Sequence, residues 1–123
     1  MKDKKYDLIV IGAGSGGLGA ALGMQQLGMD VLLIDRNSEN IGGECVNTGC
    51  VPSKALIHLG KQLHKARLSK ELGLEISGEV DIKKIKNYIH LKQEAIKVHE
   101  NVAYLRKKGL DIELGEASFY SKD

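Results

Sequence analysis

A short apolar segment followed at once by a glycine-rich turn is the feature that most limits the folds open to this chain. Residues 6–11 (YDLIVI) are typical of a strand buried on both faces of a parallel sheet. The turn GAGSGG over residues 12–17 satisfies G-x-G-x-x-G, and residues 18–27 then predict a helix that Gly28 ends. Residues 31–35 (VLLID) predict a second strand. This order predicts an α/β fold with a parallel sheet.

Each glycine of the turn has a separate task in a dinucleotide site. Gly12 permits the tight turn, Gly14 lets the backbone approach a pyrophosphate, and Gly17 allows close packing of helix on strand. The helix N-terminus offers free N–H groups and partial positive charge to the phosphates. Asp35, at the end of the second strand, is placed to accept hydrogen bonds from ribose hydroxyls, although it also suits an ordinary strand end. We expect a bound dinucleotide, and the turn alone does not distinguish NAD from FAD.

The two cysteines of the chain, Cys45 and Cys50, are close enough in sequence to oxidise to each other. A helix is expected to begin near Val51 or Pro52, and a helix N-terminus lowers the pKa of a nearby thiol. This predicts a redox-active pair beside the dinucleotide site. A zinc site is the competing chemistry, but it needs four ligands, and the histidines show no finger-like spacing to the cysteines. Two inert thiols are the other alternative, and we predict no metal site.

Composition excludes some kinds of partner. The net charge is +2 over 123 residues, without a block of like charges, so neither nucleic acid nor a membrane surface is expected. No segment has the pattern of a secretory signal or the length of a membrane span. We therefore expect a cytoplasmic protein, where paired cysteines are more often catalytic or metal-binding than structural.

Residues 42–56, GGECVNTGCVPSKAL, resemble the active-site signature of the class I FAD-dependent pyridine nucleotide-disulfide oxidoreductases. That group includes dihydrolipoamide dehydrogenase, glutathione reductase and mercuric reductase. The resemblance implies a Rossmann-like FAD-binding domain whose glycine turn holds FAD, with NAD or NADP bound by a later domain. It further implies an oxidoreductase that exchanges electrons between NAD(P)H, FAD and a redox-active Cys45–Cys50 disulfide. The signature combines features of the dihydrolipoamide dehydrogenase branch with features of mercuric reductase, so it does not assign the chain to one branch.

The resemblance also implies roles for single residues. Cys45 would exchange with a small disulfide or dithiol substrate, Cys50 would face the flavin as the charge-transfer thiol, and Lys54 would lie near the flavin N5. Glu44 stands where many relatives have Thr, and Ala117 where a glycine often contacts FAD. The cofactor-binding residues expected in this way are Gly12, Gly14, Gly17, Asp35, Gly43, Glu44, Lys54 and Ala117.

The rest of the chain predicts a long helix and two more strands. Asp81 suits the N-cap of a helix over residues 82–108 that Gly109 ends. Residues 110–114 and 117–120 predict short strands, the first in the parallel sheet.

Family members carry more domains than this length allows. We therefore expect residues 1–123 to be the N-terminal part of the FAD-binding domain, without the NAD(P)-binding and dimerisation domains of a homodimeric parent enzyme, and inactive alone. The alternatives are a non-catalytic FAD- or nucleotide-binding or thiol-switch module, and a plain NAD-dependent dehydrogenase.

Overall fold

The computed structural model describes residues 4–121, which form a three-stranded parallel sheet in the order β1-β2-β3. The strands are β1 (Leu8–Ile11), β2 (Val31–Asp35) and β3 (Asp111–Leu114). Leu8 pairs with Val31 at the start of one ladder, and Leu32 pairs with Asp111 in the other. The predicted parallel α/β fold is confirmed, including the third strand beside the first two. The strand predicted over residues 117–120 is wrong, because the chain leaves the sheet after Gly115 N–H donates to the Asp35 carbonyl at 2.8 Å.

Helix α1 (Ser15–Gln26) joins β1 to β2 as the glycine turn predicted. Gly12 has φ +98°, in the region that favours glycine, so the tight turn is confirmed. A Cβ atom on Gly17 would overlap the Gly12 carbonyl oxygen, which confirms that this position needs a glycine for close packing of α1 on β1. Gly28 follows the helix with φ +89° and ends it.

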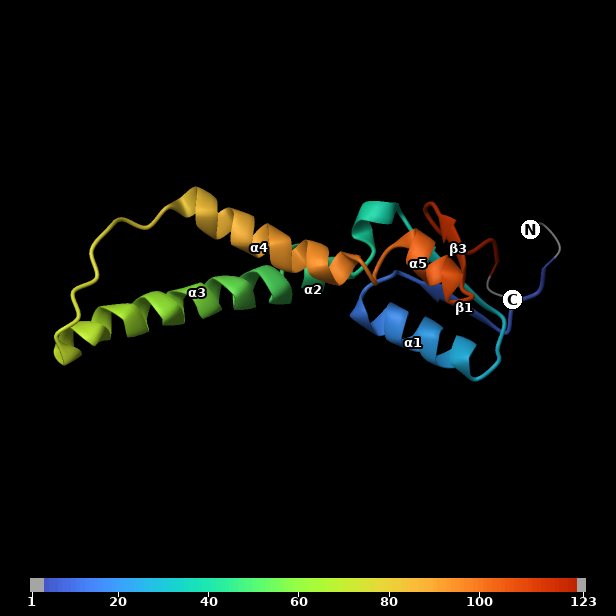
Figure 1. Cartoon of the computed structure of the whole chain (residues 1–123). Helices are drawn as coiled ribbons and strands as arrows, with labels where there is room; N and C mark the ends of the chain where they lie inside the picture. The colour runs from blue at the N-terminus through green and yellow to red at the C-terminus, as the bar shows by residue number, and fades with distance from the viewer. Residues whose placement is uncertain (1–3, 122–123) are drawn as a thin grey trace.

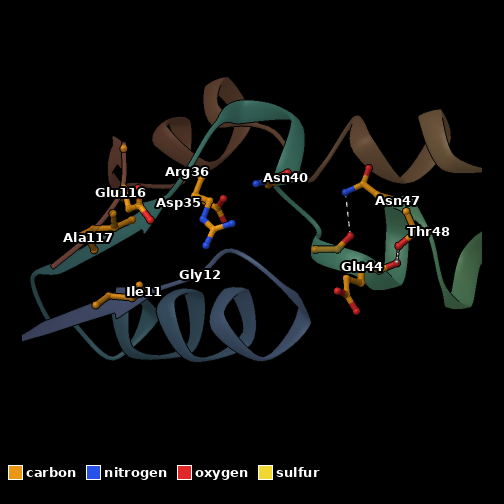
Figure 2. Close-up of a pocket in the computed structure, with 13 residues that line it drawn as sticks. Ile11, Gly12, Asp35, Arg36, Asn40, Glu44, Asn47, Thr48, Glu116 and Ala117 are labelled. Atoms are coloured by element: carbon orange, nitrogen blue, oxygen red, sulfur yellow. Dashed lines mark hydrogen bonds between the residues drawn. The ribbon is translucent and has the colours of Figure 1, made fainter.

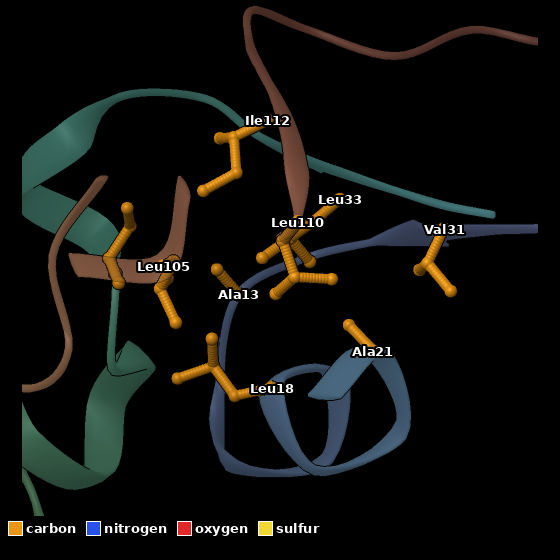
Figure 3. Packing of buried hydrophobic residues seen from close by; sticks show 9 residues of the cluster. Ala13, Leu18, Ala21, Val31, Leu33, Leu105, Leu110 and Ile112 are labelled. Carbon is orange, nitrogen blue, oxygen red and sulfur yellow. The ribbon is translucent and has the colours of Figure 1, made fainter. Parts of the chain in front are cut away.

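The hydrophobic core lies on one face of the sheet. Helix α1 and helix α5 (Val102–Lys107) cover this face, and Figure 3 shows their side chains packed against those of β2 and β3. The buried members are Ala13, Leu18, Ala21, Val31, Leu33, Ile41, Leu105, Leu110 and Ile112. On the opposite face Ile9 and Ile11 of β1 are 54% and 57% exposed. The expectation of a first strand buried on both faces is therefore wrong within residues 4–121, because no described segment covers that face.

A helical hairpin extends away from the sheet (Figure 1). It consists of α3 (Cys50–Leu68) and α4 (Ile82–Lys97), which pack side by side, and α2 (Gly43–Asn47) links the hairpin to the sheet. Short 3-10 helices η1 (Ser38–Asn40) and η2 (Ser69–Leu72) precede α2 and follow α3. The helix predicted after the cysteines is confirmed.

The long helix predicted over residues 82–108 is wrong, because the chain forms two helices there, α4 and α5. The predicted N-cap is confirmed, since Asp81 Oδ1 accepts hydrogen bonds from Lys83 N and Lys84 N at 2.8 and 3.4 Å. Asn101 causes the interruption: its side chain accepts from Tyr104 N at 2.9 Å as the N-cap of α5. Gly109, with φ +95°, ends the second helix as expected.

Candidate cofactor and disulfide site

A pocket of about 560 Å³ opens where the carboxyl ends of the three strands meet (Figure 2). Ligands of open α/β sheets bind at this end of the strands, and the volume lies within the range of small-molecule sites. The pocket is lined by Ile11, Gly12, Ile34, Asp35, Arg36, Asn40, Gly43, Glu44, Asn47, Thr48, Gly115, Glu116 and Ala117. Segments that are distant in the sequence therefore line the same pocket.

Hydrogen bonds fix the glycine turn against both neighbouring segments. The Ala13 N–H donates to Asp35 Oδ2 at 2.6 Å, so one carboxylate oxygen of Asp35 holds the turn. The Gly42 N–H donates to the Ala13 carbonyl at 2.9 Å, which ties the turn to the start of α2. A Cβ atom on Gly43 would lie 2.7 Å from Gly14 Cα, so these two glycines allow the two backbones to touch. The N-terminus of α1, with Gly14 as its N-cap, has no side-chain hydrogen bond to cap it.

Charged and amide side chains gather around the pocket. Asp35, Glu44 and Glu116 bring carboxylates to the lining, and Arg36 brings a guanidinium. The Glu44 side chain is exposed, and its role in local hydrogen bonding is through its backbone carbonyl, which accepts from Gly49 N at 2.6 Å. An exposed carboxylate remains hydrated, which reduces its repulsion of a bound phosphate.

Several lining residues were not expected from the sequence. Arg36, Asn40 and Asn47 reach the pocket, although only Asp35 beside them was expected to bind the cofactor. Asn47 lies one helical turn after Gly43 and donates from Nδ2 to the Gly43 carbonyl at 2.9 Å. Their positions could have been inferred from the carboxyl end of β2 and from the period of α2.

The expected cofactor residues fall into three groups. Those that line the pocket are Gly12, Asp35, Gly43, Glu44 and Ala117. Gly14 and Gly17 lie outside the lining and shape the turn by close backbone packing. Lys54 also lies outside the lining, exposed on α3, one turn after Cys50. The pocket and the cysteines are therefore neighbouring sites joined by α2, which carries both Glu44 and Cys45.

The two cysteines lie on different helices and are free thiols. Cys45 is half-buried in α2, whereas Cys50 is exposed as the first residue of α3. The hydrogen bond that the Cys50 thiol donates to the Cys45 sulfur raises the pKa of Cys50, as do the charge of Cys45 and partial desolvation. The Cys50 backbone N–H and the Lys54 ammonium act in the opposite direction. The expected lowering of the Cys50 pKa is therefore wrong, because a second thiol outweighs the helix N-terminus.

Neither a metal cluster nor a membrane-spanning helix is present in residues 4–121. No group of three or more His, Cys, Asp or Glu side chains in this range is placed to hold a metal ion. No helix there is both long enough and apolar enough to cross a bilayer.

Comparison with known proteins places the chain in a family. The pattern of the family described as "Pyridine nucleotide-disulphide oxidoreductase" matches residues 6–123. The dihydrolipoyl dehydrogenase of Buchnera aphidicola is 39% identical over 111 residues, which cover 88% of this chain and 23% of that protein. The corresponding enzyme of Thermus scotoductus is 44% identical over 82 residues, covering 67% of this chain and 17% of that protein.

A mercuric reductase from Lysinibacillus sphaericus is 33% identical over 123 residues, covering 97% of this chain and 22% of that protein. The matched residues make up 17%, 23% and 22% of the three relatives, so the chain spans about a fifth of their length. Members of the family use FAD and a pyridine nucleotide. The match over residues 6–123 means that this chain belongs to the pyridine nucleotide-disulphide oxidoreductase family.

Proposed function

We propose that this chain forms the FAD-binding and disulfide-carrying part of a flavin-dependent disulfide oxidoreductase of the dihydrolipoamide dehydrogenase type. The observation that carries the proposal is the position of α2, which lines the pocket through Glu44 and Asn47 and bears Cys45 beside Cys50. A nucleotide cofactor in the pocket would therefore lie next to the thiol pair.

The pocket residues fit the nucleotide part of FAD. The uncapped N-terminus of α1 presents N–H groups for the pyrophosphate, and Gly43 packed on Gly14 leaves no side chain in the way. Asp35 uses Oδ2 to hold the turn and retains Oδ1 for a ribose hydroxyl. Gly17 and Gly12 keep the turn tight, and Ala117 also lines the pocket. Lys54 stands beside Cys50, where we place the flavin ring.

The cysteines supply the thiol chemistry. In the reductive direction the Cys45 thiolate attacks a disulfide substrate, forms a mixed disulfide and releases one substrate thiolate. The Cys50 thiolate then attacks the Cys45 sulfur, forms the Cys45–Cys50 disulfide and releases the second substrate thiolate. Two protons from the cysteine thiols complete the dithiol product. Bound FAD supplies the two-electron link between this disulfide and a pyridine nucleotide.

The names of the relatives support a substrate class. Dihydrolipoyl dehydrogenases are the more frequent of the named relatives described above, and we propose a small disulfide or dithiol substrate rather than mercuric ion. We extend the proposal to NAD or NADP as the other redox partner, and to a homodimeric cytoplasmic protein in which residues 1–123 are the N-terminal part of the FAD-binding domain.

The test is an absorption titration of the purified chain with FAD, followed by reduction with a dithiol. We expect bound flavin and, after reduction, a long-wavelength band from the Cys50 thiolate against the flavin. Cys50→Ser should remove the band, whereas the matched variant Cys45→Ser should keep it. A band that survives in Cys50→Ser would contradict the assigned role.

A second variant tests the pocket itself. Asp35→Ala removes the acceptor at the end of β2, and we expect about tenfold weaker FAD binding from the loss of a charge-assisted hydrogen bond. Glu113→Ala is the control, since Glu113 is an exposed carboxylate on β3 outside the pocket lining. Equal affinity in the two variants, with unchanged circular dichroism, would place the cofactor elsewhere.

A further inference from the structure

The two thiols are separated by a break between helices rather than held by one helix. Cys45 belongs to α2 and Cys50 begins α3, with Gly49 between them at φ −115° and ψ −105°. Thr48 N and Gly49 N both donate to the Glu44 carbonyl, at 2.9 and 2.6 Å. These bonds are all local, so they do not fix α2 relative to the rest of the molecule. How closely the two sulfurs approach depends on what holds the end of α2.

Gln93 on α4 supplies a long-range hold. Its Nε2 donates to the Val46 carbonyl at 2.9 Å and to the Asn47 carbonyl at 2.8 Å. Both acceptors are in the last turn of α2, and the Gln93 side chain is partly buried. The two bonds therefore connect the segment between the cysteines to a helix that lies far along the chain, since the bonded residues are 47 and 46 positions apart.

The chemistry of this contact requires a side chain with two N–H donors. Carbonyls in the last turn of a helix have no partner within that helix and carry partial negative charge. The amide nitrogen of Gln93 satisfies both with its two hydrogens. A carboxylate of the same shape would repel them, and an apolar side chain would leave them partly buried without a partner.

We propose that Gln93 is a positioning residue that holds the end of α2, so that Cys45 meets Cys50 in the geometry a disulfide needs. The inference rests on the proposed function of the Cys45–Cys50 pair and adds the residue that maintains its geometry. Gln93 itself touches neither sulfur. It acts through the backbone of Val46 and Asn47, which lie between the two cysteines in the sequence.

The experiment measures the thiol–disulfide equilibrium of the whole chain in glutathione buffers. Two glutathione thiols give two electrons and two protons to the Cys45–Cys50 disulfide, leaving the dithiol and one glutathione disulfide. We expect Gln93→Met to lower the equilibrium constant for disulfide formation by about fivefold or more, since two hydrogen bonds are lost. The matched variant Gln62→Met, on the exposed surface of α3, should keep the original constant. Mass spectrometry after acid quenching and alkylation counts the free thiols.

The outcomes separate this inference from the function on which it rests. An unchanged constant in folded Gln93→Met, even with a lower melting temperature, would make Gln93 a structural brace only and overturn the proposal. If the unaltered chain forms no Cys45–Cys50 disulfide at any glutathione ratio, the proposed function fails instead. Should Gln93→Met not fold, Gln93→Glu keeps the side-chain shape while removing both donors at neutral pH, and the same shift is expected.

Discussion

At the scale of single residues, the pKa of the exposed Cys50 thiol depends more on neighbouring side chains than on its position at the start of α3. Its pKa is raised first by the hydrogen bond that the Cys50 thiol donates to the Cys45 sulfur, and Lys54 opposes that rise. A raised thiol pKa means less thiolate at neutral pH, so reduced Cys50 is a weaker nucleophile than an isolated cysteine at a helix N-terminus. The pKa of Cys50 therefore reflects a balance between Cys45, which raises it, and Lys54, which lowers it.

Removing the Cys45 thiol should lower the pKa of Cys50. We expect Cys45→Ala to shift the pH profile of Cys50 alkylation by iodoacetamide to lower pH, because the first cause of the raised pKa is gone. Adding Lys54→Met should move the profile back to higher pH, since the Lys54 ammonium favours the thiolate. Lys61→Met, also exposed on α3, is the control and should leave the profile in place. An identical profile with and without Cys45 would disprove the coupling.

At the scale of elements, the interrupted helix after the hairpin depends on one side chain. Asn101 Oδ1 accepts from Tyr104 N at 2.9 Å, and its Nδ2 donates to the Lys97 and Val98 carbonyls at 2.8 and 3.0 Å. The same amide thus ends α4 and begins α5. The redirected α5 places Leu105 in the core with no exposed surface, which a continuous helix in the direction of α4 would not do.

We expect Asn101→Ala to lower the free energy of unfolding by about 1 to 2 kcal/mol, because an N-cap and the last carbonyls of α4 lose their partner. Urea denaturation followed by circular dichroism measures the change. Asn87→Ala is the matched control on the exposed surface of α4, where alanine should raise helix stability by about 0.5 kcal/mol. Equal stability of the two variants would mean that the break is held by packing alone.

Features that depend on contacts between residues close in the sequence were predicted, whereas features that depend on distant residues were not. The glycine turn, the end of α1 at Gly28 and the Asp81 cap are set within a few residues, and each was predicted. The break at Asn101 was not predicted, because the apolar period of α4 continues locally and the burial of Leu105, which accompanies the break, depends on segments distant in the sequence. In the pocket, Arg36 and Asn47 were missed because their places depend on how β2 and α2 converge.

At the scale of the whole molecule, the sheet is covered on one face by α1 and α5, while the hairpin projects to the side (Figure 1). The other face of β1 presents Ile9 and Ile11 to solvent. Adjacent exposed apolar side chains on a strand that lies at the edge of the described sheet favour dye binding and self-association. The two faces of one strand should therefore respond differently to the same substitution.

Ile9→Thr and Leu8→Thr form a pair that tests this asymmetry, since threonine is β-branched and has a high strand propensity at both positions. Ile9 is 54% exposed, so Ile9→Thr should weaken fluorescence of a bound hydrophobic dye and change the free energy of unfolding by less than about 0.5 kcal/mol. Leu8 packs against the core, so Leu8→Thr should cost about 2 kcal/mol. Dye fluorescence and urea denaturation at equal chain concentration measure both effects. If Ile9→Thr destabilises as much as Leu8→Thr, the outer face of β1 is covered in solution, and sedimentation velocity would then show whether a second copy of the chain covers it.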